Sequence, residues 1–400
     1  GSIWAPDIHY YNNEWVMFYS LSPRPWDSGE FGIGLAKSDN PTGPYTDYGQ
    51  IIGDNETGGG TIDAYFTEQN GTPYMFWGSF QGIYVGELSS DLQSYDFSTQ
   101  VQVAGNAYEG TIHLERNGYH YLILSTGGCC DGFPSTYELE VGRATSFTGP
   151  YYNQNGTDLM NRDVNNKGVP ILTGNRRVPG PGHGDVIRYS DGTDWLVYHG
   201  YDTQDSGFID GVPRRVFLMD RLQWDSNDWP IVGCDGTPSE SSPAPGDSYN
   251  CSAPYSGPIS EGRYYITNVN SGKLLEVANA GTSNGDNIRQ YSDTGCTCQQ
   301  WDLTQNRDGT YNIRNVNSGL LMEVNGADYS EGATVQQYER TGHPCQRWRI
   351  VENSDGTYRI EAEHSGHVAD VYNAQTSDGA DVIQWGYWGG DNQKWTFQQV

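Results

Sequence analysis

A threefold repeat in the last third of the chain is the feature that most restricts its fold. The motif Gln-x-Trp occurs three times, and its tryptophans, Trp301, Trp348 and Trp395, are 47 residues apart. A short apolar segment with one acidic residue precedes each motif, at residues 274–277, 321–324 and 368–371. Units of this length bury a continuous core only when they pack against one another. The pattern therefore predicts a closed β structure with pseudo-threefold symmetry and the three tryptophans inside it.

This segment, residues 261–400, resembles the ricin-type β-trefoil, carbohydrate-binding module family 13. The resemblance implies that a lobe binds sugar through an acidic residue, a stacking aromatic side chain and an Asn just before the Gln-x-Trp motif. Aromatic faces stack on sugar rings, and carboxylates accept hydrogen bonds from their hydroxyls. The third lobe matches with Asp370, Trp385 and Asn392. The other two lobes offer Glu276 with Tyr291, and Glu323 with Tyr338, but Cys298 and Cys345 replace the Asn and are open to a structural role instead.

The first 234 residues predict antiparallel sheets of short strands. Four runs rich in apolar and aromatic residues each follow an Asn-Gly, Asn-Asn or Asp-Gly turn, at residues 14–19, 73–77, 119–124 and 195–199. Such turns are strong hairpin signals, and four similar units favour the blades of a β-propeller. A stretch rich in Pro and Ser then predicts a linker. We therefore expect three parts: a propeller at 1–234, a linker at 235–260 and a trefoil at 261–400.

A polar residue opens each of these four units: Asp7, Asp63, Glu109 and His183. The innermost strands of a propeller line its axis, so the four side chains should converge on one central pocket. Converging carboxylates raise one another's pKa values and keep a proton available near neutral pH. Glycoside hydrolysis needs such a carboxyl group to protonate the leaving oxygen. A single Asp or Glu is more often a turn cap or a surface group, and the recurrence in register favours the catalytic interpretation.

Residues 1–234 also resemble glycoside hydrolase family 43, the arabinanase and arabinofuranosidase group. Several short stretches carry the resemblance together: residues 1–8, 60–66, 77–83, 108–112, 125–130, 180–184 and 198–202. It implies a five-bladed propeller whose first blade precedes Gly1, with Glu109 as general acid and Asp63 as the acid that orients Glu109 and tunes its pKa. It also implies that His183 helps to hold a metal ion, often Ca²⁺, through water, and that Asp7 lines the same centre. The general base, an Asp in an Asp-Pro motif of the first blade, is expected upstream of Gly1.

These features together predict a secreted, inverting glycoside hydrolase that acts on arabinose-containing plant polysaccharide, such as α-1,5-arabinan or arabinoxylan. The alternatives are a non-catalytic glycan-binding protein, an exo-acting arabinofuranosidase, or a xylan- or galactan-directed hydrolase. The net charge of −28 disfavours nucleic acid and anionic membranes as partners, and no apolar run is long enough to span a bilayer. Seven cysteines without zinc-type spacing favour disulfides in an oxidising compartment. We expect a monomer.

Three further features have alternative interpretations. The adjacent residues Cys129 and Cys130 form either a vicinal disulfide beside the pocket or two separately buried or paired thiols. The odd number of cysteines predicts one free thiol or a partner outside this sequence. Four aromatic residues near the motifs are either platforms for sugar rings or core residues: Trp4, Trp77, Phe80 and Tyr201.

Overall fold

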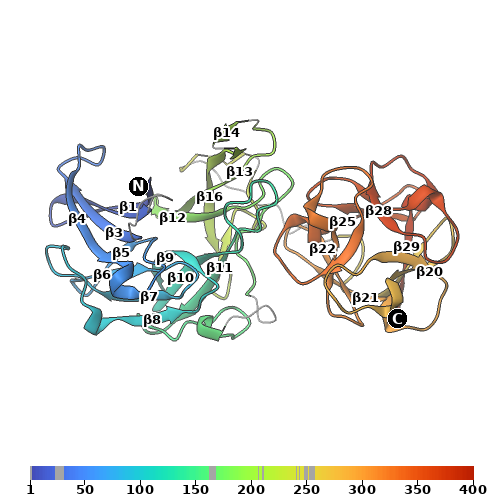
Figure 1. Cartoon of the computed structure of the whole chain (residues 1–400), viewed down its shortest axis with the longest axis horizontal. Coiled ribbons are helices and arrows are strands. Elements are labelled where there is room, and N and C mark those ends of the chain that lie inside the picture. Colours follow the sequence, from blue (N-terminus) through green and yellow to red (C-terminus); the bar gives the residue numbers. More distant parts are fainter. Residues whose placement is uncertain are drawn as a thin grey trace.

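The computed structural model describes residues 2–22, 31–161, 168–205, 207–209, 211–239, 241–242, 244–246, 251 and 257–400. The regular structure of these residues is almost entirely β, which confirms the predicted fold class. Two bodies follow one another along the chain, a ring of sheets and a compact barrel (Figure 1). Among the described residues, no helix has the length and apolar character needed to cross a membrane.

The first body is a propeller-like ring, in which the described residues form four large sheets, one for each of the four units predicted in this sequence (Figure 1). Each sheet is antiparallel, and its first strand lies nearest the centre of the ring. The first sheet contains β1 (Ser2–Tyr11), β2 (Glu14–Ser22), β3 (Gly32–Ser38) and β4 (Thr46–Gly53). The second contains β5 (Tyr65–Gln69), β6 (Thr72–Trp77), β7 (Ile83–Glu87) and β8 (Val101–Ala104).

The third sheet contains β9 (Glu109–Arg116), β10 (Tyr119–Thr126) and β11 (Glu138–Ala144). The fourth contains β12 (Gly182–Arg188), β13 (Asp194–Tyr201), β16 (Arg215–Trp224) and β17 (Pro230–Val232). A small hairpin, β14 (Phe208–Ile209) with β15 (Val212–Pro213), projects from the fourth sheet, and short helical turns lie at α1 (Asp54–Thr57), η1 (Phe97–Thr99) and η2 (Leu159–Asn161). The four predicted hairpin runs fall within β2, β6, β10 and β13.

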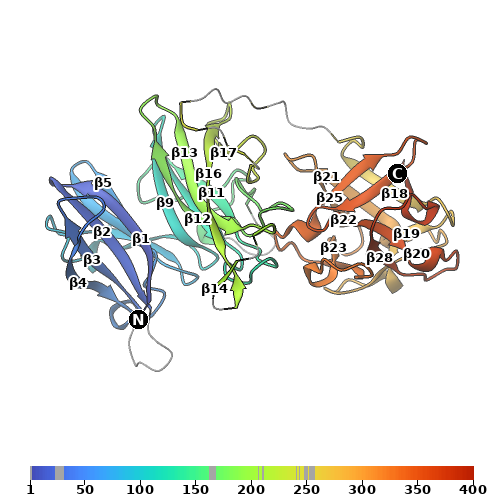
Figure 2. The same cartoon turned by 90° about the horizontal axis from the view of Figure 1, so that it is seen from above.

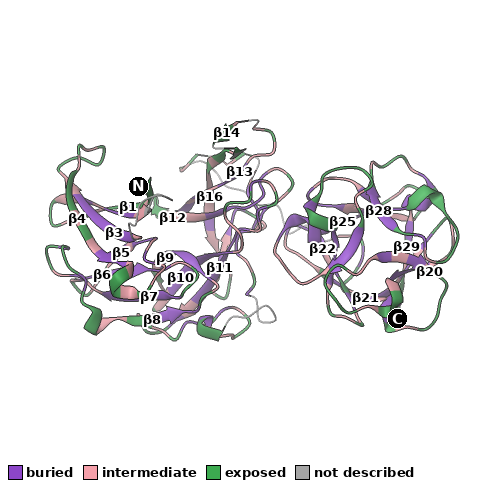
Figure 3. Cartoon of the chain, in the orientation of Figure 1, coloured by how far each residue is buried: buried purple, intermediate pink, exposed green. Residues whose placement is uncertain are grey.

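Neighbouring sheets pack face to face through alternating side chains. On β2, Val16 and Phe18 are buried and pack with Phe66 and Met75 of the second sheet. Successive strand residues point to opposite faces, so a period of two places every second side chain in such a layer. Figure 3 shows the result, with buried residues concentrated on the strands and exposed residues on the loops. Stacking of this kind fixes the inner strands around the central axis.

The second body is a β-trefoil, which confirms the predicted closed threefold structure. Twelve strands form one connected sheet: β18 (Gly262–Asn268), β19 (Leu274–Val277), β20 (Ile288–Tyr291), β21 (Gln300–Gln305), β22 (Tyr311–Asn315), β23 (Leu321–Val324), β24 (Val335–Tyr338), β25 (Trp348–Glu352), β26 (Tyr358–Ala362), β27 (Val368–Val371), β28 (Val382–Trp385) and β29 (Trp395–Gln399). Single turns connect them at η3 (Ala278–Ala280), η4 (Thr297–Gln299), η5 (Asn325–Ala327), η6 (Pro344–Gln346), η7 (Tyr372–Ala374) and η8 (Asp391–Gln393).

The three repeated tryptophans occupy equivalent places in the trefoil core. Trp301, Trp348 and Trp395 are each 0% exposed. Each indole Nε1 donates to a backbone carbonyl of the preceding apolar segment, on Leu275, Met322 and Ala369, at 3.0, 2.9 and 3.0 Å. A buried indole that finds its acceptor in this way adds a large apolar ring without leaving a polar atom unsatisfied. The 47-residue period thus marks one structural device used three times.

The trefoil lies beside the propeller (Figure 2), and polar contacts join the two. Arg340 of the second lobe donates to the buried carboxylate of Glu138 on β11 at 3.2 Å, and His343 lies 3.1 Å from the carbonyl oxygen of Phe133. The buried guanidinium of Arg347 pairs with Asp308 at 2.8 Å and also donates to the carbonyl of Gly174. The two bodies are therefore in direct contact.

Candidate active site

A cavity of about 760 Å³ lies where the four inner strands approach the axis of the ring. All four polar residues predicted to converge line it: Asp7, Asp63, Glu109 and His183. The propeller brings together residues separated by up to 176 positions because the inner edges of its sheets meet around one cavity. The cavity is the place in the described part of the propeller where these side chains can act on one ligand.

Irregular backbone aims these side chains into the cavity. The strand register breaks between Trp4 and Asp7, next to Glu109, and between Gly182 and Asp185. Asp63 and His183 have positive φ angles of 61° and 44°, which non-glycine residues seldom adopt. Bulges and strained residues of this kind redirect side chains and cluster at functional sites. Bulges therefore mark three of the four inner strands, and at the fourth a residue with positive φ, Asp63, precedes β5.

A close approach of three chain segments explains the glycine after Glu109. Gly110 has a φ of 56°, and a Cβ atom there would lie 3.1 Å from both His183 Nδ1 and Ser125 Oγ. Glycine tolerates this backbone conformation and leaves room for the imidazole. The hydroxyl of Ser125 also accepts a hydrogen bond from the backbone N–H of His183 at 3.0 Å. The Glu-Gly pair thus sets how near His183 comes to the carboxyl groups.

Glu109, predicted as the general acid, is buried and held by two hydroxyl groups. Ser79 Oγ donates to its Oε2 at 2.7 Å, and the Tyr137 hydroxyl donates to its Oε1. Burial raises the pKa of Tyr137 well above its ordinary value, so Tyr137 stays a donor. These two bonds fix the carboxyl plane on the cavity wall. The sequence analysis missed Tyr137, whose Ser-Thr-Tyr context resembles ordinary strand sequence.

Asp63 is 6% exposed and lies close to both Glu109 and His183. Burial raises its pKa to about 6, with the nearby Glu109 carboxyl adding to the increase and His183 and the Gly110 N–H opposing it. The nearest His183 nitrogen, Nδ1, is 4.0 Å from Asp63 Oδ2. Asp63 therefore retains its proton in mildly acidic solution.

Asp7 lines the same cavity and is held firmly by its surroundings. Its carboxylate accepts the Phe66 N–H at 2.6 Å and lies 2.7 Å from His9 Nε2. The neighbouring carboxyl of Asp185 was not predicted, although it follows His183 by two residues on the same strand. Burial, together with the charge of Asp7, raises the pKa of Asp185 to about 6. Asp7 and Asp185 therefore form a second group of carboxyl side chains in the cavity that contains Asp63 and Glu109.

His199 and Arg215 line the same cavity as these acids. Burial, then the charges of Arg215 and His183, lower the pKa of His199 to about 3, so this imidazole is neutral. Arg215 Nη1 lies 3.1 Å from His199 Nε2, and its other terminal nitrogen lies 3.6 Å from the sulfur of Cys130. Cys129 and Cys130 form the vicinal disulfide that was one of the two predicted alternatives, and both line the cavity. The site therefore has a cationic as well as an acidic side.

The four candidate sugar platforms divide between the two predicted alternatives. Trp4 is 44% exposed and lines the cavity. Phe80 is exposed outside the cavity lining, whereas Trp77 and Tyr201 are 1% exposed and belong to the core. Trp77 stacks on Tyr84 within the second sheet, which accounts for its burial. Of the four, Trp4 has the accessible face that a sugar ring requires at this cavity.

The acidic residues predicted for the trefoil occupy one equivalent position in each lobe. The Gln of each Gln-x-Trp motif donates to that carboxylate, joining Gln299 to Glu276, Gln346 to Glu323 and Gln393 to Asp370 at 3.0, 2.8 and 2.8 Å. The spacing that recurs in the three motifs thus has a second physical role: besides placing the tryptophan, it places the Gln side chain against the carboxylate. Each carboxylate keeps lone pairs for further hydrogen bonds, since an ionised carboxyl group has about four acceptor positions.

The third lobe has the most complete predicted set. Asn392 donates to Asp370 Oδ1 at 2.8 Å, and Trp385 is 38% exposed on β28. In the first lobe, Arg289 donates to Glu276 Oε1 at 2.9 Å and lies over the ring of Tyr291. In the second lobe, Gln336 donates to Glu323 at 2.8 Å, and Tyr338 is half-buried. The Asp, Asn and exposed aromatic ring therefore occur together in the third lobe.

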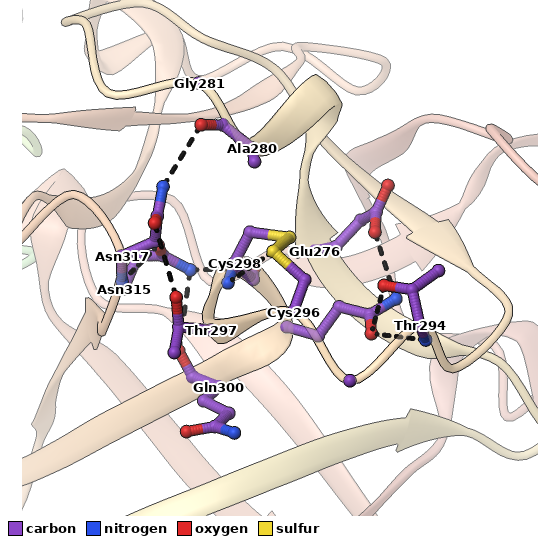
Figure 4. The surroundings of a disulfide bond; sticks show 12 residues. Glu276, Ala280, Gly281, Thr294, Cys296, Thr297, Cys298, Gln300, Asn315 and Asn317 are labelled. Atoms are coloured by element: carbon purple, nitrogen blue, oxygen red, sulfur yellow. Dashed lines mark hydrogen bonds between the residues drawn. A yellow bond between two sulfur atoms is a disulfide. The ribbon is translucent and has the colours of Figure 1, made fainter.

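The two cysteines that replace the Asn differ in state. Cys298 forms a disulfide with Cys296 beside Glu276 (Figure 4). Cys234 pairs with Cys251, and Cys345 is a free, buried thiol, so the odd count leaves one cysteine unpaired, as one of the two alternatives predicted. Burial raises the pKa of Cys345 well above its ordinary value, which keeps it protonated and unreactive.

Comparisons with known proteins agree with this geometry. Residues 1–230 match the model for glycosyl hydrolases family 43, and residues 254–338, 298–385 and 344–400 match the ricin-type beta-trefoil lectin domain-like model. The extracellular endo-alpha-(1->5)-L-arabinanase 1 of Bacillus subtilis (strain 168) is 34% identical over 235 residues, covering 57% of this chain and 68% of the relative. The extracellular exo-alpha-(1->5)-L-arabinofuranosidase ArbA of Cellvibrio japonicus (strain Ueda107) is 30% identical over 255 residues, covering 58% and 70%.

One solved structure gives a similar result. The Cellvibrio cellulosa alpha-L-arabinanase complexed with arabinohexaose is 28% identical, covers 57% of this chain and 76% of that one, and superposes with a TM-score of 0.50. The matched region contains all four polar residues of the central cavity, and the trefoil follows it. The chain therefore belongs to glycosyl hydrolases family 43, as a glycoside hydrolase whose propeller is followed by a ricin-type β-trefoil lectin-like domain.

Proposed function

We propose that the chain hydrolyses α-1,5-linked arabinan with inversion, outside the cell, and that Glu109 is its general acid. The observation that carries the proposal is the placement of Glu109 and Asp63 in one cavity, on the inner strands of a family 43 propeller. Two relatives named for α-(1->5)-arabinan cleavage, one endo-acting and one exo-acting, support the choice of substrate.

The proposed mechanism assigns a different task to each carboxyl group. Glu109 donates its proton to the leaving glycosidic oxygen, while Ser79 and Tyr137 keep its carboxyl plane in position. Asp63 lies close to Glu109, and its negative charge would favour return of a proton to Glu109 for the next cycle. An inverting reaction also requires a general base that activates water from the opposite face of the sugar. We assign this base to the upstream Asp-Pro position implied by the family resemblance.

The residues around His183 fit the proposed Ca²⁺ through water. Ca²⁺ prefers oxygen ligands, so a histidine contacts it most readily through a bound water molecule. The His183 side chain is 28% exposed to the cavity, which leaves room for such a water, and the Asp63 carboxylate lies 4.0 Å away. The ion would supply positive charge beside the carboxyl pair. His183, Asp63 and Asp7 are the residues that would surround it.

Three features support the extracellular assignment and the glycan-directed role of the trefoil. Three disulfides occur among the described residues, and such bonds persist in oxidising compartments. Both relatives are named extracellular. In the third lobe, Asp370, Asn392 and the exposed Trp385 provide the hydrogen-bonding and stacking groups that a sugar ring needs. We propose that this lobe binds polysaccharide and that the protein acts as a monomer.

Reducing-sugar release from linear α-1,5-arabinan tests the proposal, using the 400-residue chain and any longer natural form of it. Removal of a general acid typically costs about 10²- to 10⁴-fold in rate, so Glu109→Gln should lose activity on arabinan by that factor. An aryl arabinofuranoside with an acidic phenol leaving group needs no proton, and on this substrate the same variant should retain most of its activity. Proton NMR of the first product should show the inverted anomer.

Other outcomes would lead to different conclusions. Equal loss on both substrates would remove Glu109 from the general-acid role, because the defect would not depend on the leaving group. Cleavage of xylan or β-galactan in preference to arabinan would overturn the substrate assignment but keep the hydrolase. Sugar binding without cleavage of any of these polymers would favour a non-catalytic glycan-binding protein.

A further inference from the structure

Three potential metal ligands lie together on the β9–β10 hairpin, outside the central cavity. His113 and Glu115 are two residues apart on β9, so their side chains point to the same face of the sheet. His120 of β10 is the direct cross-strand partner of Glu115. One ligand atom from each residue lies within 4.8 Å of the others. None of the three lines the cavity that contains Glu109.

Two of the three ligand separations match the edges of a tetrahedral metal site, and the third is no longer than 4.8 Å. His113 Nε2 is 3.2 Å from His120 Nδ1, and His120 Nδ1 is 3.4 Å from Glu115 Oε1. Zinc binds nitrogen and carboxylate oxygen at about 2.0–2.2 Å, which gives ligand-to-ligand edges of about 3.3–3.5 Å in a tetrahedron. A small movement of His113 and Glu115 would place all three atoms around one ion.

Surrounding side chains already orient the two imidazoles. Thr67 Oγ1 lies 3.3 Å from His113 Nδ1, and a hydrogen bond there leaves Nε2 with its lone pair facing His120. Phe76 stacks on His113 at 5.4 Å, and Phe147 packs edge-on against both His113 and His120 at 5.2 and 5.7 Å. A metal-binding histidine usually makes a hydrogen bond through its second ring nitrogen, as His113 does with Thr67.

The site is also accessible from solvent. A cavity of about 390 Å³ borders it and is lined by His113, Glu115 and Thr67, with Glu68 and Asp194 at its margin. The Glu115 side chain is 51% exposed, so it can turn toward an incoming ion. The open side leaves a fourth coordination position for water. Two imidazoles with a single carboxylate suit Zn²⁺, Co²⁺, Ni²⁺ or Cu²⁺ rather than Ca²⁺ or Mg²⁺.

We propose that His113, Glu115 and His120 form a transition-metal site, with Zn²⁺ as its occupant, that ties β9 to β10. Strand β9 begins at Glu109, four residues before His113, a distance of about 13 Å along the strand. A metal bridge at this point would hold the strand that carries the proposed acid against its neighbour. The site differs from the proposed Ca²⁺ position at His183 in location and in ligand type.

Isothermal titration calorimetry, in which Zn²⁺ is added to the full chain after treatment with a chelator, tests this proposal. We expect one equivalent of Zn²⁺ to bind, and expect His120→Gln and Glu115→Gln to weaken that binding at least tenfold. The equivalent should persist in His183→Gln, which alters the propeller centre, and in His367→Gln, which alters a half-buried histidine of the trefoil. Thr67→Val keeps all three ligands and should weaken binding about 10- to 100-fold by releasing His113.

Cobalt provides a direct view of the geometry. Co²⁺ added in place of Zn²⁺ should give visible absorption bands of a four-coordinate ion, and these bands should be absent in Glu115→Gln. Because Glu115 is largely exposed, this variant should fold even if His120→Gln does not. Zinc binding that is absent from the wild-type chain, or that is unchanged in both His120→Gln and Glu115→Gln, would overturn the proposal.

Discussion

Replacing Asp63 by Asn should stabilise the folded propeller at neutral pH while it impairs the proposed chemistry. Asp63 is 6% exposed, and burial is the main cause of the increase in its pKa from 3.8 to about 6. The folded chain therefore holds this proton up to about pH 6, whereas the unfolded chain releases it near pH 3.8. In that interval the folded state binds more protons, so the free energy of unfolding falls as pH rises.

The size of the effect follows from the same pKa values. One pKa unit corresponds to about 1.4 kcal/mol, so a rise of about two units costs the folded state about 3 kcal/mol above pH 6. Asn has nearly the same shape and cannot ionise. The free energy of unfolding of Asp63→Asn, taken relative to wild type, should therefore increase by about 3 kcal/mol between pH 4 and pH 7.

Urea unfolding of both proteins across this pH range measures the difference, with tryptophan fluorescence as the signal and a chelator present so that no bound cation neutralises Asp63. Asp191→Asn is a suitable control because hydrogen bonds from the Thr193 side chain and backbone lower the pKa of this exposed carboxyl group. That variant should become less stable relative to wild type as pH rises, the opposite sign. A difference for Asp63→Asn that is independent of pH, or that decreases as pH rises, would refute the assignment of a buried, proton-holding Asp63.

Three other predictions concern the trefoil, the contact between the two bodies and the proposed ion. Trp385→Ala should weaken the retention of the protein in arabinan-containing gels at least tenfold. Tyr152→Ala, which removes an exposed aromatic residue of the propeller, should not weaken it. If Trp385→Ala is retained as strongly as the wild type, Trp385 does not belong to the sugar site. Arg347→Met should destabilise the chain by about 3–5 kcal/mol in thermal or urea unfolding, because it leaves the buried Asp308 carboxylate without its cation; a loss below about 1 kcal/mol would contradict this. Chelation should lower arabinan hydrolysis, and Ca²⁺ but not Zn²⁺ should restore it if the ion at His183 is calcium.

Much of the architecture could be predicted because it depends on local patterns. The 47-residue tryptophan period and the turn-flanked apolar runs are visible in the sequence, and both correspond to strands in the structure. The cavity-lining positions of Asp7, Asp63, Glu109 and His183 could be anticipated for a related reason. Each stands at the start of a hairpin unit, and the topology of a propeller places such starts at its axis.

Other parts of the site depend on long-range packing that a local pattern does not contain. Trp77 and Tyr201 occur next to the same motifs as Trp4, yet they are buried, because Trp77 packs in a hydrophobic core cluster and Tyr201 lies under the loop of Cys129, to whose carbonyl its hydroxyl donates. Tyr137 reaches Glu109 across 28 residues, and the raised pKa of Asp185 comes first from its burial and then from the charge of Asp7 on another sheet. The Cys296–Cys298 pairing likewise followed from neither spacing nor repeat.

The direct contact between propeller and trefoil has a consequence for how polymer length affects the enzyme. Arg340, His343 and Arg347 bind the trefoil to the propeller surface, so the third-lobe site and the central cavity are held at a set separation. Two linked sites reinforce each other only when one ligand can span them. For a glycan bound at Asp370 and Trp385, the gain in avidity should therefore begin above a threshold chain length, with shorter oligosaccharides binding each site independently.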